Sequence, residues 1–283
     1  MLKQRVITAL VLLAVLLPAL AASTAWPFAV LTLVFIGAGG WEWARLNGLT
    51  GAGALALGGL VAAGGAWALV SGWAWQLDGV GSLWLFAVLT WVLGGALVLR
   101  GGGALWARWP QSLRWVIGVV VLWLAWGAMA VAKQRGLNFL LSVFCLVWAA
   151  DVAAYFGGRA FGKRKLAPAI SPGKSWEGVW TGQIGTLLLA FGWMAVDRHV
   201  ALGSDSIYTV LERQLGVVGL VAGVLFLAAM SVVGDLFESL IKRQAGAKDS
   251  SALLPGHGGV LDRIDALLPV LPIALYLVSL NHG

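Results

Sequence analysis

The stretch "LGVVGLVAGVLFLAAMSVVGDLFESLIKR", from Leu215 to Arg243, decides the fold class of this chain. Its first twenty residues carry no charged side chain, and an apolar run of roughly 18 or more residues predicts a helix that crosses a membrane. Similar runs fill most of the chain, which is 60% hydrophobic and 11% charged. A soluble domain carries roughly 25% charged residues. The sequence therefore predicts an all-α, polytopic membrane protein.

Nine apolar segments are expected to form a bundle of about nine transmembrane helices. They are 6–22, 26–44, 52–74, 82–99, 114–132, 137–157, 177–196, 215–241 and 265–280. If the N-terminus is cytoplasmic, fifteen Lys and Arg residues lie on the cytoplasmic side and four on the other side, as the positive-inside rule favours. The net charge of +7 then follows from topology, and no nucleic-acid partner is expected.

This orientation places two long charged loops, 158–176 and 242–264, in the cytoplasm. We therefore predict a catalytic region over 137–283, and N-terminal helices over 1–136 that serve packing, lipid access or dimer contacts. The first apolar segment also resembles a signal peptide, with basic residues before it and "ALAAS" at its end. An uncleaved helix is favoured, because a second span follows almost at once.

Polar side chains gather at the end of the 215–241 segment. Carboxylates inside a span are costly and usually functional. Asp235, Glu238, Ser239 and Lys242 are spaced at three or four residues, so a helix places them on one face. The alternative is an internal ion pair of Asp235 or Glu238 with Lys242.

A second pair of acids, Asp262 and Asp265, begins the last apolar segment. Acids at a helix start also favour the helix dipole, and for Asp265 this alternative is competitive. A hairpin of the last two segments could bring Asp235 and Asp262 together. Two carboxylates without His or Cys partners suit Mg²⁺, which commonly uses one or two carboxylates plus substrate phosphates.

The segment from Asp151 to Gly178 supplies basic groups. Asp151, Tyr155 and Arg159 follow one helix face. Lys163 belongs to the basic run "GKRK", which simple topological charge also explains. Arg159 and Lys163 lie in the first part of the predicted loop 158–176.

The same loop contains "GKS", residues 173–175, which invites comparison with a phosphate loop. That motif requires a glycine five positions before Gly173, where this chain has Pro168. Ser175 is predicted to cap the helix that follows. Lys174, just before that helix, lies where anions bind.

Glycines in the loop 242–264 complete the pattern. Gly256, Gly258 and Gly259 allow a backbone to approach phosphate closely. His257, among them, serves either a structural hydrogen bond or a phosphate contact. Together these features predict a basic, metal-capable pocket at the membrane edge that suits a polyphosphate.

The sequence "SLIKRQAGAKDSSALLPGHGGVLDRID", from Ser239 to Asp265, resembles the signature of the phosphatidate cytidylyltransferases, or CDP-diacylglycerol synthases. The segments "DVAAYFGGRAFGKRK", "SPGKSWEG" and "GDLFES" resemble the same family. The resemblance covers roughly the C-terminal half, and the N-terminal half matches in hydropathy and in "WEWARL". One departure is Gly173, where the family often has a second lysine.

The resemblance implies that CTP and phosphatidic acid react to CDP-diacylglycerol and pyrophosphate, in phospholipid biosynthesis at a bacterial inner membrane. It implies Mg²⁺, a second monovalent cation such as K⁺, and a homodimer, with Asp235 and Asp262 as metal ligands. The alternatives are a CTP-dependent lipid kinase and a transporter of an anionic lipid or metabolite. The candidate catalytic residues are Asp235, Asp262, Lys242, Arg243, Lys248, Asp249 and Arg263. The candidate substrate-binding residues are Arg159, Lys163, Lys174, Ser175, Ser239, Gly256, His257, Gly258, Gly259 and Asp265.

Overall fold

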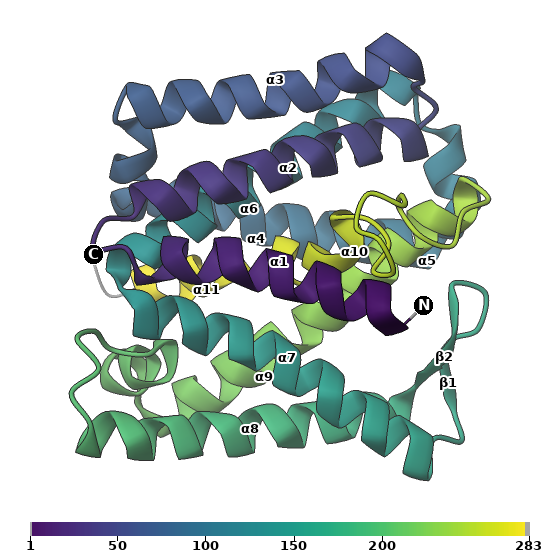
Figure 1. The fold of residues 1–283 in the computed structure, drawn as a ribbon. Coiled ribbons are helices and arrows are strands. Elements are labelled where there is room, and N and C mark those ends of the chain that lie inside the picture. Colours follow the sequence, from purple (N-terminus) through teal and green to yellow (C-terminus); the bar gives the residue numbers. More distant parts are fainter. Residues whose placement is uncertain (1, 281–283) are drawn as a thin grey trace.

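The protein is a bundle of long helices, described by a computed structural model over residues 2–280 (Figure 1). In chain order the elements are α1 Leu2–Ala21, α2 Trp26–Leu46, α3 Gly51–Val70, the 3₁₀ helix η1 Trp73–Gly79, α4 Gly81–Leu89, the π-helix η2 Thr90–Gly94, α5 Gly95–Arg108, α6 Gln111–Arg135, α7 Leu137–Phe161, β1 Lys165–Ala167, β2 Ser171–Ser175, α8 Trp176–His199, α9 Ile207–Gln244, α10 Leu261–Ile264 and α11 Leu267–Ser279. The predicted all-α class is confirmed.

Within residues 2–280, eight helices are long and apolar enough to cross a membrane, with α4, η2 and α5 forming one of them. They correspond to the first eight predicted segments. The ninth, 265–280, becomes α11, which has 13 residues and lies buried along most of its length. A helix needs about 20 residues to cross a bilayer. This segment is apolar because neighbouring helices surround it.

The predicted loop 158–176 contains secondary structure that the sequence did not indicate. Strands β1 and β2 pair antiparallel, with Lys165 opposite Ser175 and Ala167 opposite Ser171. The hairpin projects at the end of the bundle where the chain between α9 and α10 also lies (Figure 1). Ser175 caps α8 as predicted, because its Oγ accepts a hydrogen bond of 3.2 Å from the amide of Gly178.

An aromatic cluster fixes the second half of α9 against the N-terminal helices. The ring of Phe237 lies 6.1 Å from that of Trp43, 5.4 Å from that of Trp91 and 5.6 Å from that of Trp106. Each such pair contributes about 0.5–1.5 kcal/mol beyond area burial. Because Phe237 follows Asp235 by two residues, this packing also sets the rotation of the polar face of α9.

Helix α1 is held at both ends. Near its C-terminus, the Nζ of Lys133 donates to the carbonyl oxygens of Leu20, at 2.7 Å, and Ala22, at 3.2 Å. At the other end, Thr8 Oγ1 donates to the carbonyl of Pro255 at 2.9 Å. Helix α1 is therefore packed as an element of the fold and contacts the glycine-containing loop.

Candidate active site

A cavity of about 450 Å³, whose largely apolar wall carries several charged side chains, opens between α7, α8, α9 and strand β2. It gathers several predicted residues from distant parts of the chain, namely Arg159, Lys174, Ser175 and Asp235. Asp151 and Tyr155 of α7 line it as well. This confirms the prediction that Asp151, Tyr155 and Arg159 lie on one face of a helix. The cavity combines fixed positive charge with carboxylates, as a phosphate-binding site that also holds a cation requires.

Asp235 is held by two partners in this cavity. Its Oδ2 lies 2.5 Å from Lys174 Nζ, and its Oδ1 accepts a hydrogen bond of 3.3 Å from Ser239 Oγ. The predicted face of α9 is therefore confirmed for Asp235 and Ser239. The alternative that paired Asp235 with Lys242 is wrong, because the hairpin carries Lys174 to Asp235 instead.

Asp262 is held by both of its carboxylate oxygens. Its Oδ1 lies 2.5 Å from Lys242 Nζ, and its Oδ2 accepts from Ser250 N at 2.9 Å, Ser250 Oγ at 2.9 Å and Gly259 N at 2.7 Å. Burial alone would raise the pKa of Asp262. The Lys242 ammonium and the amide donors outweigh that effect and hold the pKa below its ordinary value.

Lys242 also forms an ion pair with Glu238, one turn earlier on α9, at 2.5 Å between Nζ and Oε2. The alternative of an internal pair is thus confirmed for Glu238. The pair does not exclude a functional role, because the same ammonium reaches Asp262. Lys242 therefore joins the end of α9 to the start of α10.

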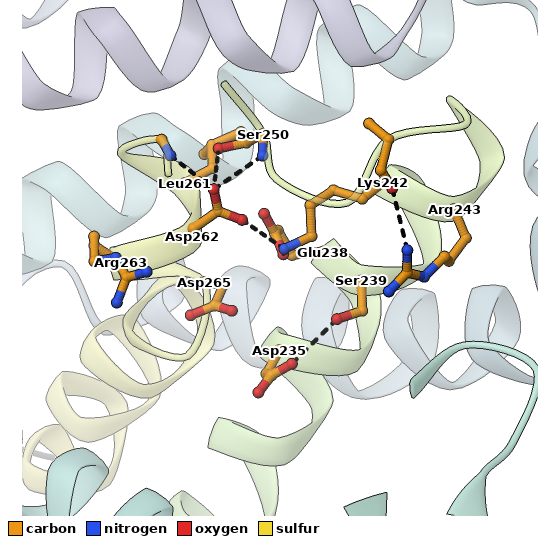
Figure 2. A network of polar contacts seen from close by, with 12 residues as sticks. Asp235, Glu238, Ser239, Lys242, Arg243, Ser250, Leu261, Asp262, Arg263 and Asp265 are labelled. Atoms are coloured by element: carbon orange, nitrogen blue, oxygen red, sulfur yellow. Dashed lines mark hydrogen bonds and ion pairs between the residues drawn. The ribbon is translucent and has the colours of Figure 1, made fainter. Parts of the chain in front are cut away.

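Asp235, Asp262 and Asp265 lie around one region at the junction of α9, α10 and α11 (Figure 2). Burial, and then the nearby charge of Asp235, raise the pKa of Asp265. The Oδ1 of Asp265 accepts a hydrogen bond of 2.7 Å from the amide of Ala266. The predicted hairpin of α9 and the last segment is therefore present and brings these carboxylates into one neighbourhood.

The donor chemistry fits a hard cation in part. Among residues 2–280, no group of three or more His, Cys, Asp or Glu side chains is placed to hold a metal ion. Two carboxylates, Asp235 and Asp262, each with a lysine beside it, match a Mg²⁺ site that takes its other ligands from substrate phosphates and water. Magnesium binding stays a prediction.

Two of the predicted glycines, Gly258 and Gly259, lie against carboxylates of the protein itself, and Gly256 lies against Arg5 of α1. Gly256 and Gly258 have φ of 78° and 83°, which favour glycine. A Cβ on Gly258 would lie 2.7 Å from Asp262 Oδ2, and a Cβ on Gly259 would collide with Ser250 Oγ and with Glu42. Close packing of the loop, against Asp262, Glu42 and α1, thus explains these glycines, and contact with phosphate stays a prediction.

His257 contributes mainly its backbone in this structure. Its carbonyl accepts from Arg263 Nε at 3.0 Å and Nη2 at 2.5 Å, and its amide donates to Leu254 at 2.8 Å. Its Nδ1 is buried, and no hydrogen-bond partner is found for it among the described residues. The structural alternative therefore holds for the backbone of His257, and a side-chain contact with phosphate stays a prediction.

The remaining predicted residues lie outside the lining of the cavity. Arg243 of α9 donates from Nε to the carbonyl of Ile170 at 3.4 Å, which ties the helix to the hairpin turn. Lys163, Lys248 and Asp249 are exposed. No ion pair is found for these three side chains among residues 4–280, and their direct roles with substrate stay predictions.

A family model for the cytidylyltransferase family matches residues 3–281. The chain belongs to that family. It is 41% identical to the phosphatidate cytidylyltransferase of Pseudomonas aeruginosa over 279 residues, which are 96% of this chain and 95% of the relative. It is 52% identical to the phosphatidate cytidylyltransferase of Haemophilus influenzae over 142 residues, 50% of this chain and 46% of the relative. It is 40% identical to that of Bacillus subtilis over 147 residues, 52% and 49% of the two chains.

The sequence motifs of this cytidylyltransferase-family protein lie in its C-terminal half, but the family model also matches the N-terminal half. It includes α1 to α6, and one residue of that part belongs to the site. Glu42 of α2 is fully buried and accepts hydrogen bonds from the loop that carries Ser250 and Gly259. The signal that could have found it is the acid of "WEWARL" inside an apolar span.

Glu177, in the first turn of α8, is a second residue that motif reasoning left out. Its carboxylate accepts from the amides of Lys163, at 3.0 Å, and Arg164, at 3.1 Å, and pairs with the Arg164 guanidinium at 3.3 Å. It therefore shapes the start of the hairpin that delivers Lys174. Its place at a helix N-terminus, where acids are favoured, was the available signal.

Proposed function

We propose that this cytidylyltransferase-family protein transfers the cytidylyl group of CTP to phosphatidic acid, forming CDP-diacylglycerol and pyrophosphate. One observation carries the proposal. Asp235 lines the cavity, and Asp262 lies with it where α9 meets α10 and α11; each of the two carboxylates is paired with a lysine (Figure 2). The name of the Pseudomonas aeruginosa relative, matched over 95% of its length, supports the same reaction.

The chemistry requires charge neutralisation more than a strong base. The phosphate of phosphatidic acid is already anionic, so one of its oxygens can attack the α-phosphorus of CTP directly. A new bond joins that oxygen to the α-phosphorus, while the bond from the α-phosphorus to the bridging oxygen of pyrophosphate breaks. Catalysis then rests on in-line positioning and electrostatic stabilisation.

Basic side chains of the site suit this task. Arg159 and Lys174 line the cavity and would bind phosphate oxygens of CTP or of the lipid. Lys242 lies between Glu238 and Asp262, where it can stabilise negative charge that develops at the junction. Arg243, Lys248 and Arg263 would offset the remaining negative charge of the substrates near the loop.

Asp235 and Asp262 are the residues that would hold Mg²⁺, and a second monovalent cation such as K⁺ would bind nearby. A bound Mg²⁺ neutralises and orients phosphate oxygens. Before the substrates bind, Lys174 and Lys242 neutralise the same two carboxylates. Each lysine can then exchange its carboxylate partner for a phosphate, because an ammonium on a flexible stem has three donors.

We further propose that the N-terminus and this site face the cytoplasm of a bacterial inner membrane, and that the protein is a homodimer. The orientation is supported by the distribution of fifteen against four basic residues. The bacterial sources of the relatives support the assignment to a bacterial membrane. The family resemblance supports the dimer, and a crosslinking or mass measurement in detergent would test it.

The proposed reaction is tested with the purified protein in detergent, CTP, Mg²⁺ and dioleoyl phosphatidic acid. The expected products are CDP-diacylglycerol and pyrophosphate in equal amounts. CDP together with a phosphorylated lipid would instead indicate the lipid kinase. A transporter would show no turnover in this assay and would move substrate across reconstituted vesicles.

A further inference from the structure

Glu42 is a carboxylate buried inside the bundle and bound by one loop. It lies near the end of α2 and is 0% exposed. Its Oε1 accepts from Ser251 Oγ at 2.6 Å and from Val260 N at 2.9 Å. Its Oε2 accepts from Leu261 N at 2.8 Å and from Ser250 Oγ at 3.1 Å. All four donors therefore come from residues 250–261, more than 200 positions away in the chain.

These donors are neutral groups, and within residues 4–280 no Lys, Arg or His forms an ion pair with Glu42. A buried polar group is costly unless it is hydrogen-bonded. Each oxygen of Glu42 takes one backbone amide. Oε1 also takes the Ser251 hydroxyl, and Oε2 shares the single hydroxyl proton of Ser250 with Asp262. The loop must therefore keep this shape for Glu42 to stay buried, and Glu42 in turn fixes the shape of the loop.

The same loop fixes Asp262. Ser250 Oγ lies 2.9 Å from Asp262 Oδ2 and 3.1 Å from Glu42 Oε2, so the two carboxylates share its single hydroxyl proton. The amide of Gly259 donates to Asp262, and the next two amides donate to Glu42. Because three loop donors occupy Asp262 Oδ2, its Oδ1 is left to face Lys242, as Figure 2 shows.

We infer that Glu42 is a positioning residue, which sets the loop 250–261 so that Asp262 presents Oδ1 toward the reaction site. The inference rests on the proposed function, since it gives Asp262 its task there. Glu42 lies in α2, outside the region predicted to be catalytic, and so couples the N-terminal helices to the site. Groups that orient a metal-binding side chain typically change metal affinity or activity by about 10- to 100-fold when removed.

The decisive variant is Glu42→Gln, which keeps the shape and replaces one acceptor by an NH₂ donor. Whichever way the amide turns, it faces either Val260 N or Leu261 N, and neither backbone donor can reverse. We expect the Mg²⁺ concentration for half-maximal CDP-diacylglycerol synthesis to rise by about 10-fold or more, within the range for orienting groups. We also expect amide hydrogen exchange in 250–261 to increase in metal-free protein.

The matched control is Asp197→Asn. Asp197 is a half-buried carboxylate that also accepts from neutral groups, namely Asn138 Nδ2 at 2.9 Å, Ser206 Oγ at 2.5 Å and Thr209 Oγ1 at 2.6 Å. It lies at the end of α8, away from the cavity. We expect this variant to lower thermal stability without changing the Mg²⁺ dependence or the exchange of 250–261.

If Glu42→Gln fails to fold, Ser251→Ala replaces it, because it removes a single donor to Glu42. The expected changes then have the same direction and smaller size. Unchanged exchange in 250–261 together with an unchanged Mg²⁺ dependence, in whichever variant folds, would overturn the role of Glu42. A wild-type protein that makes no CDP-diacylglycerol would overturn the proposed function instead, and the exchange measurement would still report on the loop.

Discussion

Lys174 of strand β2 and Asp235 of helix α9 form an ion pair of 2.5 Å across 61 residues of sequence. Both side chains are partly buried at about one quarter exposure, with 26% for Lys174 and 27% for Asp235. The contact joins the hairpin to the helix that carries the candidate metal ligand. It therefore gives the hairpin a direct place in the proposed chemistry.

Replacing Lys174 by Met is expected to lower kcat/KM for CTP by at least about 100-fold, because the variant loses a charge that would stabilise the transferring phosphate. The measurement is steady-state CDP-diacylglycerol formation with CTP varied. Lys165→Met is the matched control, since it removes a lysine from the same hairpin at an exposed position outside the cavity. Equal losses in the two variants would contradict a specific role for Lys174.

Asp262→Asn is expected to abolish turnover while the protein still inserts into the membrane. The amide cannot neutralise Lys242, and it is a much poorer ligand for Mg²⁺ than a carboxylate. Product formation would be measured beside size-exclusion chromatography of the detergent-solubilised protein. An Asp262→Asn protein that retains wild-type activity would refute the metal assignment.

Gly259→Ala is expected to destabilise the protein by about 1–3 kcal/mol, the usual cost of overpacking. The added methyl would meet Ser250 Oγ and Glu42 Oε1. Thermal unfolding in detergent provides the comparison. Gly192→Ala in α8 has open space around its Cβ and is expected to leave the melting temperature unchanged or slightly raised. A stable Gly259→Ala protein would show that the loop can move away from Glu42.

Cysteine labelling can test the orientation of the bundle. The chain has one cysteine, Cys145, so a Cys145→Ala background accepts single reporters. Ala201→Cys and Ala252→Cys place exposed thiols in the segments after α8 and after α9. A membrane-impermeant maleimide is expected to label the Ala201→Cys variant in intact spheroplasts, and the Ala252→Cys variant only after permeabilisation. The reverse pattern would invert the proposed topology.

The sequence predicted the class, the first eight spans and the meeting of α9 with the last segment, because apolar length and spaced acids are local signals. It did not predict that Lys174 reaches Asp235, since the partner depends on where a long-range hairpin lands. The sequence also did not predict that "SPGKS" forms strand β2, because its proline and glycine are poor strand formers. Glu42 was missed because its four donors become neighbours only through tertiary packing.

Helix α9 is broken at Gly216, where φ is 68°. The length of helix after this break can be compared with the thickness of a bilayer. Asp235 follows the break by 19 residues, about 28 Å along a helix that rises about 1.5 Å per residue. The hydrocarbon layer of a bilayer is about 30 Å thick. If the break lies at the outer boundary of the hydrocarbon layer and the helix follows the membrane normal, we expect the carboxylate at the level where hydrocarbon gives way to glycerophosphate. A lipid phosphate can meet a water-soluble nucleotide at that level while both acyl chains remain among their neighbours.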